Sequence, residues 1–168
     1  MPGNSFIKFA GVTEGESLQE NFPGSAGWIE IGDWSWDIEA ESSFLKGGGA
    51  AVGKAQPGAL SFSHYYDKSS PHIKRNIVKG VHFKEVVIVM CKQTGEHDLP
   101  QEYFRVVMEN AFTTKVSTKG GEDGAVTQDC EMVCKNILVQ YKAQGNDGKL
   151  AQSPIEFQWD IAGNKLVK

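Results

Sequence analysis

Apolar and polar residues alternate along much of this chain, which is the pattern of strands with one buried face. The cleanest example is 155–161, where every second residue is apolar. Further strands are expected at 60–66, at 102–109 and at 125–141, and 86–90 is an unbroken apolar run. The sequence therefore predicts a mainly β protein, either barrel-like or built from two packed antiparallel sheets.

The sequence also predicts an interruption within the long strand over 125–141 and a turn before it. Asn136 is expected to interrupt the long strand over 125–141, and the glycine-rich segment 117–124 is expected to form the turn before it. Residues 6–9 add a short first strand, and 17–26 have no steady period and are expected to be a loop.

One short helix is expected, over about Pro71 to Lys79. Two serines precede Pro71, which suits the first helical position, and Gly80 suits the left-handed position after the last turn. A helix this short is marginal alone, so its apolar stripe should pack on the sheet. The expected stripe is Ile73, Ile77, Val78 and Val81.

The segment 29–38 changes its pattern part-way. The isoleucines at 29 and 31 have one parity and the tryptophans at 34 and 36 the other, which predicts a bulge near Gly32 and Asp33. If Trp34 and Trp36 point inward, the residues between and beside them form an outward polar row that faces water or a partner. This row is Asp33, Ser35 and Asp37.

The segment 42–58 contains five glycines and Pro57, and we expect a long protrusion. Its spacing of Gly48, Gly53 and Lys54 nearly matches a phosphate-binding loop. Ala55 lacks the hydroxyl that would bind magnesium, and the proline blocks the helix that should follow, so nucleotide binding is not predicted.

The length of 168 residues fits one domain over 1–168. A net charge of -4 with no basic block gives no reason to expect nucleic acid or an anionic membrane as partner. No apolar run approaches the roughly 20 residues of a membrane span, and the first residues do not resemble a signal peptide. We expect synthesis and folding in the cytosol, without membrane insertion.

The candidate chemistry is sparse. Cys130 and Cys134 would lie on one face of a strand about 13 Å apart, too far for a disulfide, and three cysteines suit a reducing compartment. The histidines have no metal-binding spacing with one another or with Cys91. A Cys91 nucleophile lacks an oxyanion motif, and alternating carboxylates such as Asp33 and Asp37 are more often a solvated face than a glycosidase pair. No catalytic residue, metal or cofactor is predicted, and the chain is interpreted as a non-enzyme.

Several stretches together resemble the haemolysin-coregulated protein family, the tube-forming proteins of bacterial type VI secretion systems. Their order and spacing carry the resemblance over nearly the whole chain. The stretches are Phe6-Ile7-Lys8, Gly15-Glu16, Trp34-Ser35-Trp36, Gly53-Lys54-Ala55, Leu60-Ser61-Phe62, Asp67-Lys68-Ser69-Ser70-Pro71, Gly80-Val81-His82-Phe83-Lys84-Glu85, Val116-Ser117-Thr118 and Phe157-Gln158-Trp159-Asp160-Ile161.

The resemblance implies a β-barrel-like protomer with one flanking helix that forms stacked hexameric rings, secreted with a spike protein by a contractile sheath. It also implies that the ring lumen carries and stabilises effector proteins, with Ser35, Asp33 and Asp37 facing the lumen. The protruding loop would then contact other protomers or rings. The loop residues expected at this interface are Phe44, Lys46, Gly48, Gly53 and Lys54.

A different class of protein remains as the alternative, a small ligand-binding or carbohydrate-binding β-sandwich. Its tryptophans would be exposed as stacking platforms, whereas the tube interpretation expects Trp34, Trp36 and Trp159 to be mostly buried.

Overall fold

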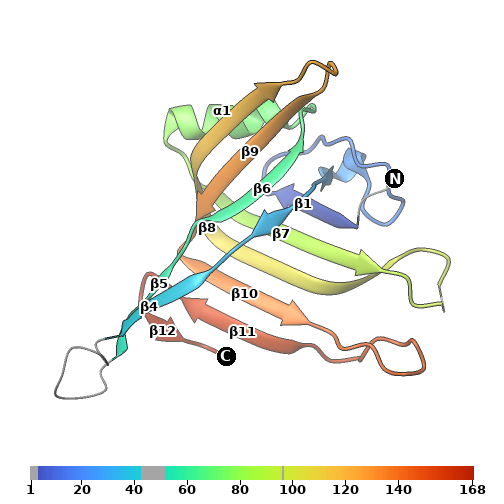
Figure 1. The fold of residues 1–168 in the computed structure, drawn as a ribbon, viewed down its shortest axis with the longest axis vertical. Helices are drawn as coiled ribbons and strands as arrows, with labels where there is room; N and C mark the ends of the chain where they lie inside the picture. The colour runs from blue at the N-terminus through green and yellow to red at the C-terminus, as the bar shows by residue number, and fades with distance from the viewer. Residues whose placement is uncertain (1–3, 43–51, 96) are drawn as a thin grey trace.

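A computed structural model describes residues 4–42, 52–95 and 97–168 (Figure 1). Within them the chain is mainly β with one α-helix, as predicted. The strands are β1 (Ser5–Phe9), β2 (Ile29–Glu30), β3 (Trp34–Ser35), β4 (Ile38–Ser42), β5 (Val52–Pro57), β6 (Leu60–Tyr65), β7 (Phe83–Lys92), β8 (Gln101–Gly120), β9 (Val126–Val133), β10 (Asn136–Tyr141), β11 (Ile155–Asp160) and β12 (Lys165–Leu166). The helix is α1 (Ser70–Lys79), and a short 3-10 turn is η1 (Gly24–Ala26).

Ten strands form one antiparallel sheet with two lobes that share β8 (Figure 1). The first lobe has the strand order β12-β11-β10-β8-β7-β1-β2, and the second lobe is β3-β6-β9-β8. The hairpin β4–β5 is a separate two-stranded sheet. The prediction of antiparallel sheets with one short helix is confirmed.

Strand β8 is far longer than expected. It connects the two lobes because it is long enough to pair with strands of both. Its first half pairs with β7 and β10, and its second half, from Phe112, pairs with β9. Asn110 lies between the halves with a φ of 52°, in the left-handed region that asparagine tolerates better than most residues. The predicted strand end at Glu109 is therefore wrong: the strand passes through Asn110, and the turn begins only at Gly121.

The expected break at Asn136 is nearly right. Strand β9 ends at Val133 and β10 begins at Asn136, so the chain leaves one lobe for the other within two residues. Cys134 lies in this connection and not on a strand shared with Cys130, which corrects the expected one-face arrangement. The three cysteines are free thiols, as predicted.

Both faces of β7 are buried, which explains its unbroken apolar run. Val86 and Ile88 belong to the main core between the lobes, whereas Val87 and Val89 belong to a second core on the other face. The irregular segment before β2 covers this second core with Phe22, whose ring stacks on Phe6 at 5.1 Å. Segment 17–26 is irregular apart from η1, as expected, but it contributes to the core.

The prediction of a bulge within one strand near Gly32 is wrong. Strand β2 ends at Glu30 in the first lobe, and β3 begins at Trp34 in the second lobe. The change of parity therefore marks a crossing between lobes, where the chain exchanges one set of neighbours for another.

Helix α1 lies where it was predicted, but the hydrogen bonds at its first turn differ from the expected serine cap. The carboxylate of Asp67 accepts hydrogen bonds from the amide of Ser69 at 2.9 Å and from its hydroxyl, and Ser70 Oγ accepts from the amide of Asp67 at 3.0 Å. Gly80 has a φ of 68° at the end of the helix, as expected.

The predicted apolar stripe of α1 is only partly buried. Ile73 is fully buried and Ile77 is half-buried, whereas Val78 and Val81 are exposed. The helix therefore rests on the sheet mainly through Ile73, and the wider stripe is wrong.

The glycine-rich segment is partly a strand. Residues 52–57 form β5, which pairs with β4, so this part of the expected protrusion over 42–58 is one strand of a hairpin. Gly53 and Lys54 are exposed on β5. Phe44, Lys46 and Gly48 lie outside the described residues.

Candidate functional site

A shallow hollow of about 210 Å³, lined by short polar residues and by two aromatic ones, lies where β3 pairs with β6. Ser35 is opposite Ser61 in the strand register, and their hydroxyl oxygens are 2.9 Å apart. We call this site the serine hollow. Its lining residues are Asp33, Trp34, Ser35, Ser61, Phe62, Ser63 and Asp129.

The alternation of β6 produces this surface. Leu60, Phe62 and His64 are buried, so Ser61 and Ser63 must point to the opposite face of the strand. Ser35 is exposed on the same side, as the sequence predicted from its place between two tryptophans. The sequence pattern of 60–65 already indicated which serines face outward, but only the pairing of β3 with β6 brings them to Ser35.

The predicted polar row is divided in the structure. Asp33 and Ser35 line the serine hollow, but Asp37 does not. The carbonyl of Asp37 accepts a hydrogen bond from the amide of Gly58 at 2.8 Å, at the base of the β4–β5 hairpin. Asp129, which the sequence analysis did not identify, supplies the second carboxylate because its strand β9 pairs with β6.

The serine hollow offers hydroxyls and two carboxylates, which can exchange hydrogen bonds with many polar partners. Among the described residues, no group of three or more His, Cys, Asp and Glu side chains could hold a metal ion. The geometry suits reversible polar contacts more than chemistry on a bound substrate.

An apolar hollow of about 310 Å³ lies beside Trp34 and Trp36. Both indoles are half-buried, and the ring of Trp34 is 5.8 Å from that of Phe104. Of the three tryptophans expected to be mostly buried, only Trp159 is buried in the described protomer. Trp34 and Trp36 pack on the core with one side and leave the other side accessible.

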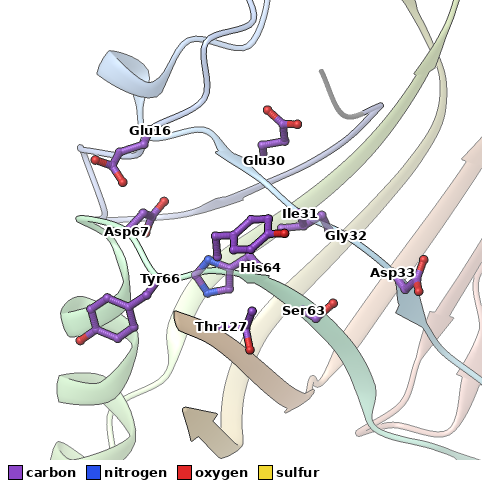
Figure 2. A pocket seen from close by; sticks show the side chains of 11 residues that line it. Glu16, Glu30, Ile31, Gly32, Asp33, Ser63, His64, Tyr66, Asp67 and Thr127 are labelled. Atoms are coloured by element: carbon purple, nitrogen blue, oxygen red, sulfur yellow. The ribbon is translucent and has the colours of Figure 1, made fainter. Parts of the chain in front are cut away.

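A larger cleft of about 580 Å³ lies between the segment around Glu16 and the end of β6 (Figure 2). The imidazole of His64 lines it and is 4 % exposed. The side-chain nitrogen of Gln128, a fully buried residue, lies 3.1 Å from His64 Nε2. Burial lowers the pKa of His64, and the nearby Asp67, the Tyr65 peptide and Asp129 oppose this effect more weakly.

Comparison with known proteins identifies the family. The family described as "Type VI secretion system effector, Hcp" matches residues 6–144. Protein hcp1 of Pseudomonas aeruginosa is 31% identical over 166 residues, which is 98% of each chain. The chain belongs to the haemolysin-coregulated protein (Hcp) family.

Solved structures agree with this assignment. Hcp1 from Salmonella typhimurium has a TM-score of 0.77 at 27% identity and covers 99% of this chain and 100% of its own. A structure described as a type six secretion system protein has a TM-score of 0.86 at 21% identity, covering 97% and 98% of the two chains. At that identity the second likeness concerns the fold alone. No described helix of this Hcp-family chain has the length and apolar character to cross a membrane.

The three thiols of this Hcp-family chain are poorly suited to nucleophilic chemistry. Burial raises the pKa of Cys91 and of Cys130 to about 12, and that of Cys134 to about 11. A thiol is nucleophilic as the thiolate, so these groups are inert near neutral pH. Cys91 lies in the second core of apolar side chains, which fits a packing role.

Proposed function

We propose that this chain, as one domain over residues 1–168, is a tube subunit of a type VI secretion system. Its protomers close into hexameric rings that stack into a tube, and the serine hollow faces the channel and holds effector proteins. Membership of the Hcp family supports the tube role. The observation that carries the cargo role is the exposed Ser35 hydroxyl paired with Ser61 in an open hollow.

The chemistry of the serine hollow fits a carrier that must also release its cargo. Serine hydroxyls donate and accept, so they can form hydrogen bonds with many protein surfaces. Each such bond contributes only about 1 kcal/mol net, because it replaces a bond to water. A wall of short polar side chains therefore holds cargo by several weak contacts, and Ser35 belongs to that wall.

The fold offers surfaces for self-assembly. A ring repeats one head-to-tail interface that closes on itself, and stacking adds a second interface along the axis. The β4–β5 hairpin is not paired with either lobe in the described protomer, and it presents Gly53 and Lys54 to solvent. We assign ring or stacking contacts to this hairpin and to Phe44, Lys46 and Gly48 in the segment beside it.

The proposed partners follow from this role. They are further copies of the same chain, the spike protein at the tip of the tube, the contractile sheath around it and effectors in the lumen. Synthesis would occur in the bacterial cytoplasm, with export by the secretion system. No enzymatic activity is proposed.

The test is effector co-purification with Ser35→Gln rings. The longer amide extends into the hollow from an exposed position on β3, so ring formation should persist while effector binding is lost. Rings that hold effectors as well as the unmodified protein would remove Ser35 from the cargo site.

A further inference from the structure

Two exposed apolar side chains of this protein lie among charges of opposite sign. Leu18 is 95 % exposed and Val78 is 86 % exposed, the two highest values among the large apolar residues that the structure describes. The packing of α1 explains the burial of Ile73 but leaves Val78 without a role. A single exposed apolar residue is ordinary on a protein surface, so the charges around each one decide whether it belongs to a contact surface.

Leu18 lies in an acidic segment before β2. Residues 13–20 contain three glutamates and no lysine or arginine, and these glutamates are exposed. The segment is held against the protomer, because the amide of Ser17 donates to the carbonyl of Trp28 at 3.3 Å and its carbonyl accepts from the amide of Gly24 at 2.9 Å. The charges therefore have a fixed place on the surface. We call this surface the acidic patch, which is Glu14, Glu16, Leu18 and Glu20.

Val78 lies among basic residues of α1. The helix contains Lys74, Arg75 and Lys79 and no acidic residue. Lys74 already has a contact within the protomer, since its ammonium lies 4.8 Å from the ring centre of Tyr66. Arg75 and Lys79 are exposed, and helical spacing places them with Val78 on the side of α1 away from the core. We call this surface the basic patch, which is Arg75, Val78 and Lys79.

The two patches do not neutralise each other within the protomer. The segment that contains Leu18 covers the second core, whereas α1 rests on the main core. The salt bridges of the described residues lie elsewhere, between Arg105 and Glu102 and between Lys168 and Glu156. Both patches are therefore available to a partner, and a second copy of this chain supplies the complementary surface for each.

We propose that the acidic patch of one copy packs on the basic patch of the next copy, with Leu18 against Val78 and the glutamates beside Arg75 and Lys79. This inference rests on the proposed function, since it names a surface through which the copies assemble. Unlike charges favour this pairing, and like charges oppose the alternatives. Each contact leaves one patch of either kind free, so the contact repeats from copy to copy. Together with the β4–β5 hairpin it provides the two kinds of contact that stacked rings need.

A disulfide between the two apolar positions tests this packing directly, because it forms only when the Cα atoms come within about 7 Å. The variant is Leu18→Cys/Val78→Cys. After mild oxidation it should give covalent oligomers larger than a dimer on a denaturing gel, since each copy contributes a thiol to two contacts. Leu18→Cys/Ile155→Cys, with the second thiol at another exposed apolar position, should give none. The unmodified protein, whose three native thiols are free, measures the background.

Charge reversal tests the pairing by an independent route. Glu16→Lys and Arg75→Glu should each raise the protein concentration at half-assembly about fivefold or more. The combined variant Glu16→Lys/Arg75→Glu should return this concentration to within about twofold of the unmodified protein, because unlike charges face each other again. Glu16→Lys/Lys165→Glu has the same net charge but changes an exposed lysine of β12 instead, and should assemble as weakly as Glu16→Lys.

Sedimentation of the unmodified protein separates the two kinds of failure. If it assembles but Leu18→Cys/Val78→Cys gives no oligomers larger than a dimer, the contact between the patches is wrong while the proposed function stands. The same conclusion follows if the two combined charge variants assemble equally. If the unmodified protein remains a monomer, the proposed function fails together with this inference.

Discussion

The hydroxyl oxygens of Ser35 and Ser61 lie 2.9 Å apart across the pairing of β3 with β6, at the surface of the second lobe. Each hydroxyl has a partner in the protomer and keeps further capacity for hydrogen bonds. The serine hollow therefore depends on the register between β3 and β6, because a shift of one residue would turn Ser35 toward the core.

Ser35→Gln should therefore separate cargo binding from stability. The longer side chain points away from the core, so the free energy of unfolding should change by no more than about 0.5 kcal/mol. Rings should form, but effector co-purification and effector abundance in producing cells should fall. Ser153→Gln, at an exposed loop serine outside the hollow, is the matched control and should leave effector levels unchanged. Loss of rings in Ser35→Gln would show instead that this face is an interface between protomers.

Lys54→Glu tests the assembly role of the β4–β5 hairpin. Lys54 is exposed on β5, so charge reversal should preserve the fold and the thermal unfolding midpoint of the protomer. Sedimentation should show a smaller assembled fraction, because a charge of the wrong sign would face the neighbouring protomer. Lys119→Glu, at an exposed site near the end of β8, should leave assembly intact. Assembly that is equally unaffected in both variants would exclude Lys54 from the interface.

The two isoleucines of α1 should differ in their contribution to stability. Ile73 is fully buried in the main core, so Ile73→Ala should cost about 2 to 4 kcal/mol. Ile77 is half-buried, and Ile77→Ala should cost less than about 1.5 kcal/mol because less area is lost. Urea unfolding of both variants measures this difference. Equal losses would show that α1 packs through its whole apolar stripe.

The stability of the protomer should fall on both sides of neutral pH. The pKa of His64 is lowered from its usual 6.5, so the unfolded chain binds the proton more tightly, and stability is lost as pH falls below 6.5. The thiols act oppositely. The pKa of Cys91 and of Cys130 is raised from 9.0 to about 12, so the unfolded chain loses protons first and stability falls as pH rises above 9.0.

Urea midpoints between pH 5 and pH 10 check this profile. In Cys91→Ala and Cys130→Ala the decline above pH 9.0 should be smaller than in the unmodified protein, whatever the variants do to stability at pH 7. A decline of the same steepness in both variants would mean that other groups cause it.

The sequence predicted the elements whose patterns are local. The alternation of 60–65 predicted which residues of β6 are buried, and Gly80 predicted the end of α1. It also placed Ser35 on the outside of its strand. These features depend on neighbours within a few residues, so period and turn chemistry determine them.

Other features depend on pairing between distant segments and were missed for that reason. Strand β8 continues past Glu109 because Asn110 adopts a positive φ and the strand finds a new partner in β9. Asp129 reaches the serine hollow only through the pairing of β9 with β6. Asp37 shares the parity of Ser35 but is drawn to the base of the hairpin by the hydrogen bond from Gly58.

The His64–Gln128 contact is another feature that local sequence patterns do not predict. The sequence marks His64 as an inward residue of β6, but nothing local indicates that Gln128 faces it from a strand 64 residues away. The cleft needs a third segment as well, since Glu16 comes from the irregular chain before β2. A site made by three distant segments has no sequence spacing that would reveal it.

The central claim is that protomers of this chain close into a ring, and the mass of the purified protein in solution tests it most directly. Sedimentation velocity with light scattering at micromolar concentration should give a single species of six times the chain mass of 18.4 kDa, and electron micrographs of that species should show rings. A homogeneous species of 18.4 kDa under the same conditions, with no larger assembly, would contradict the account.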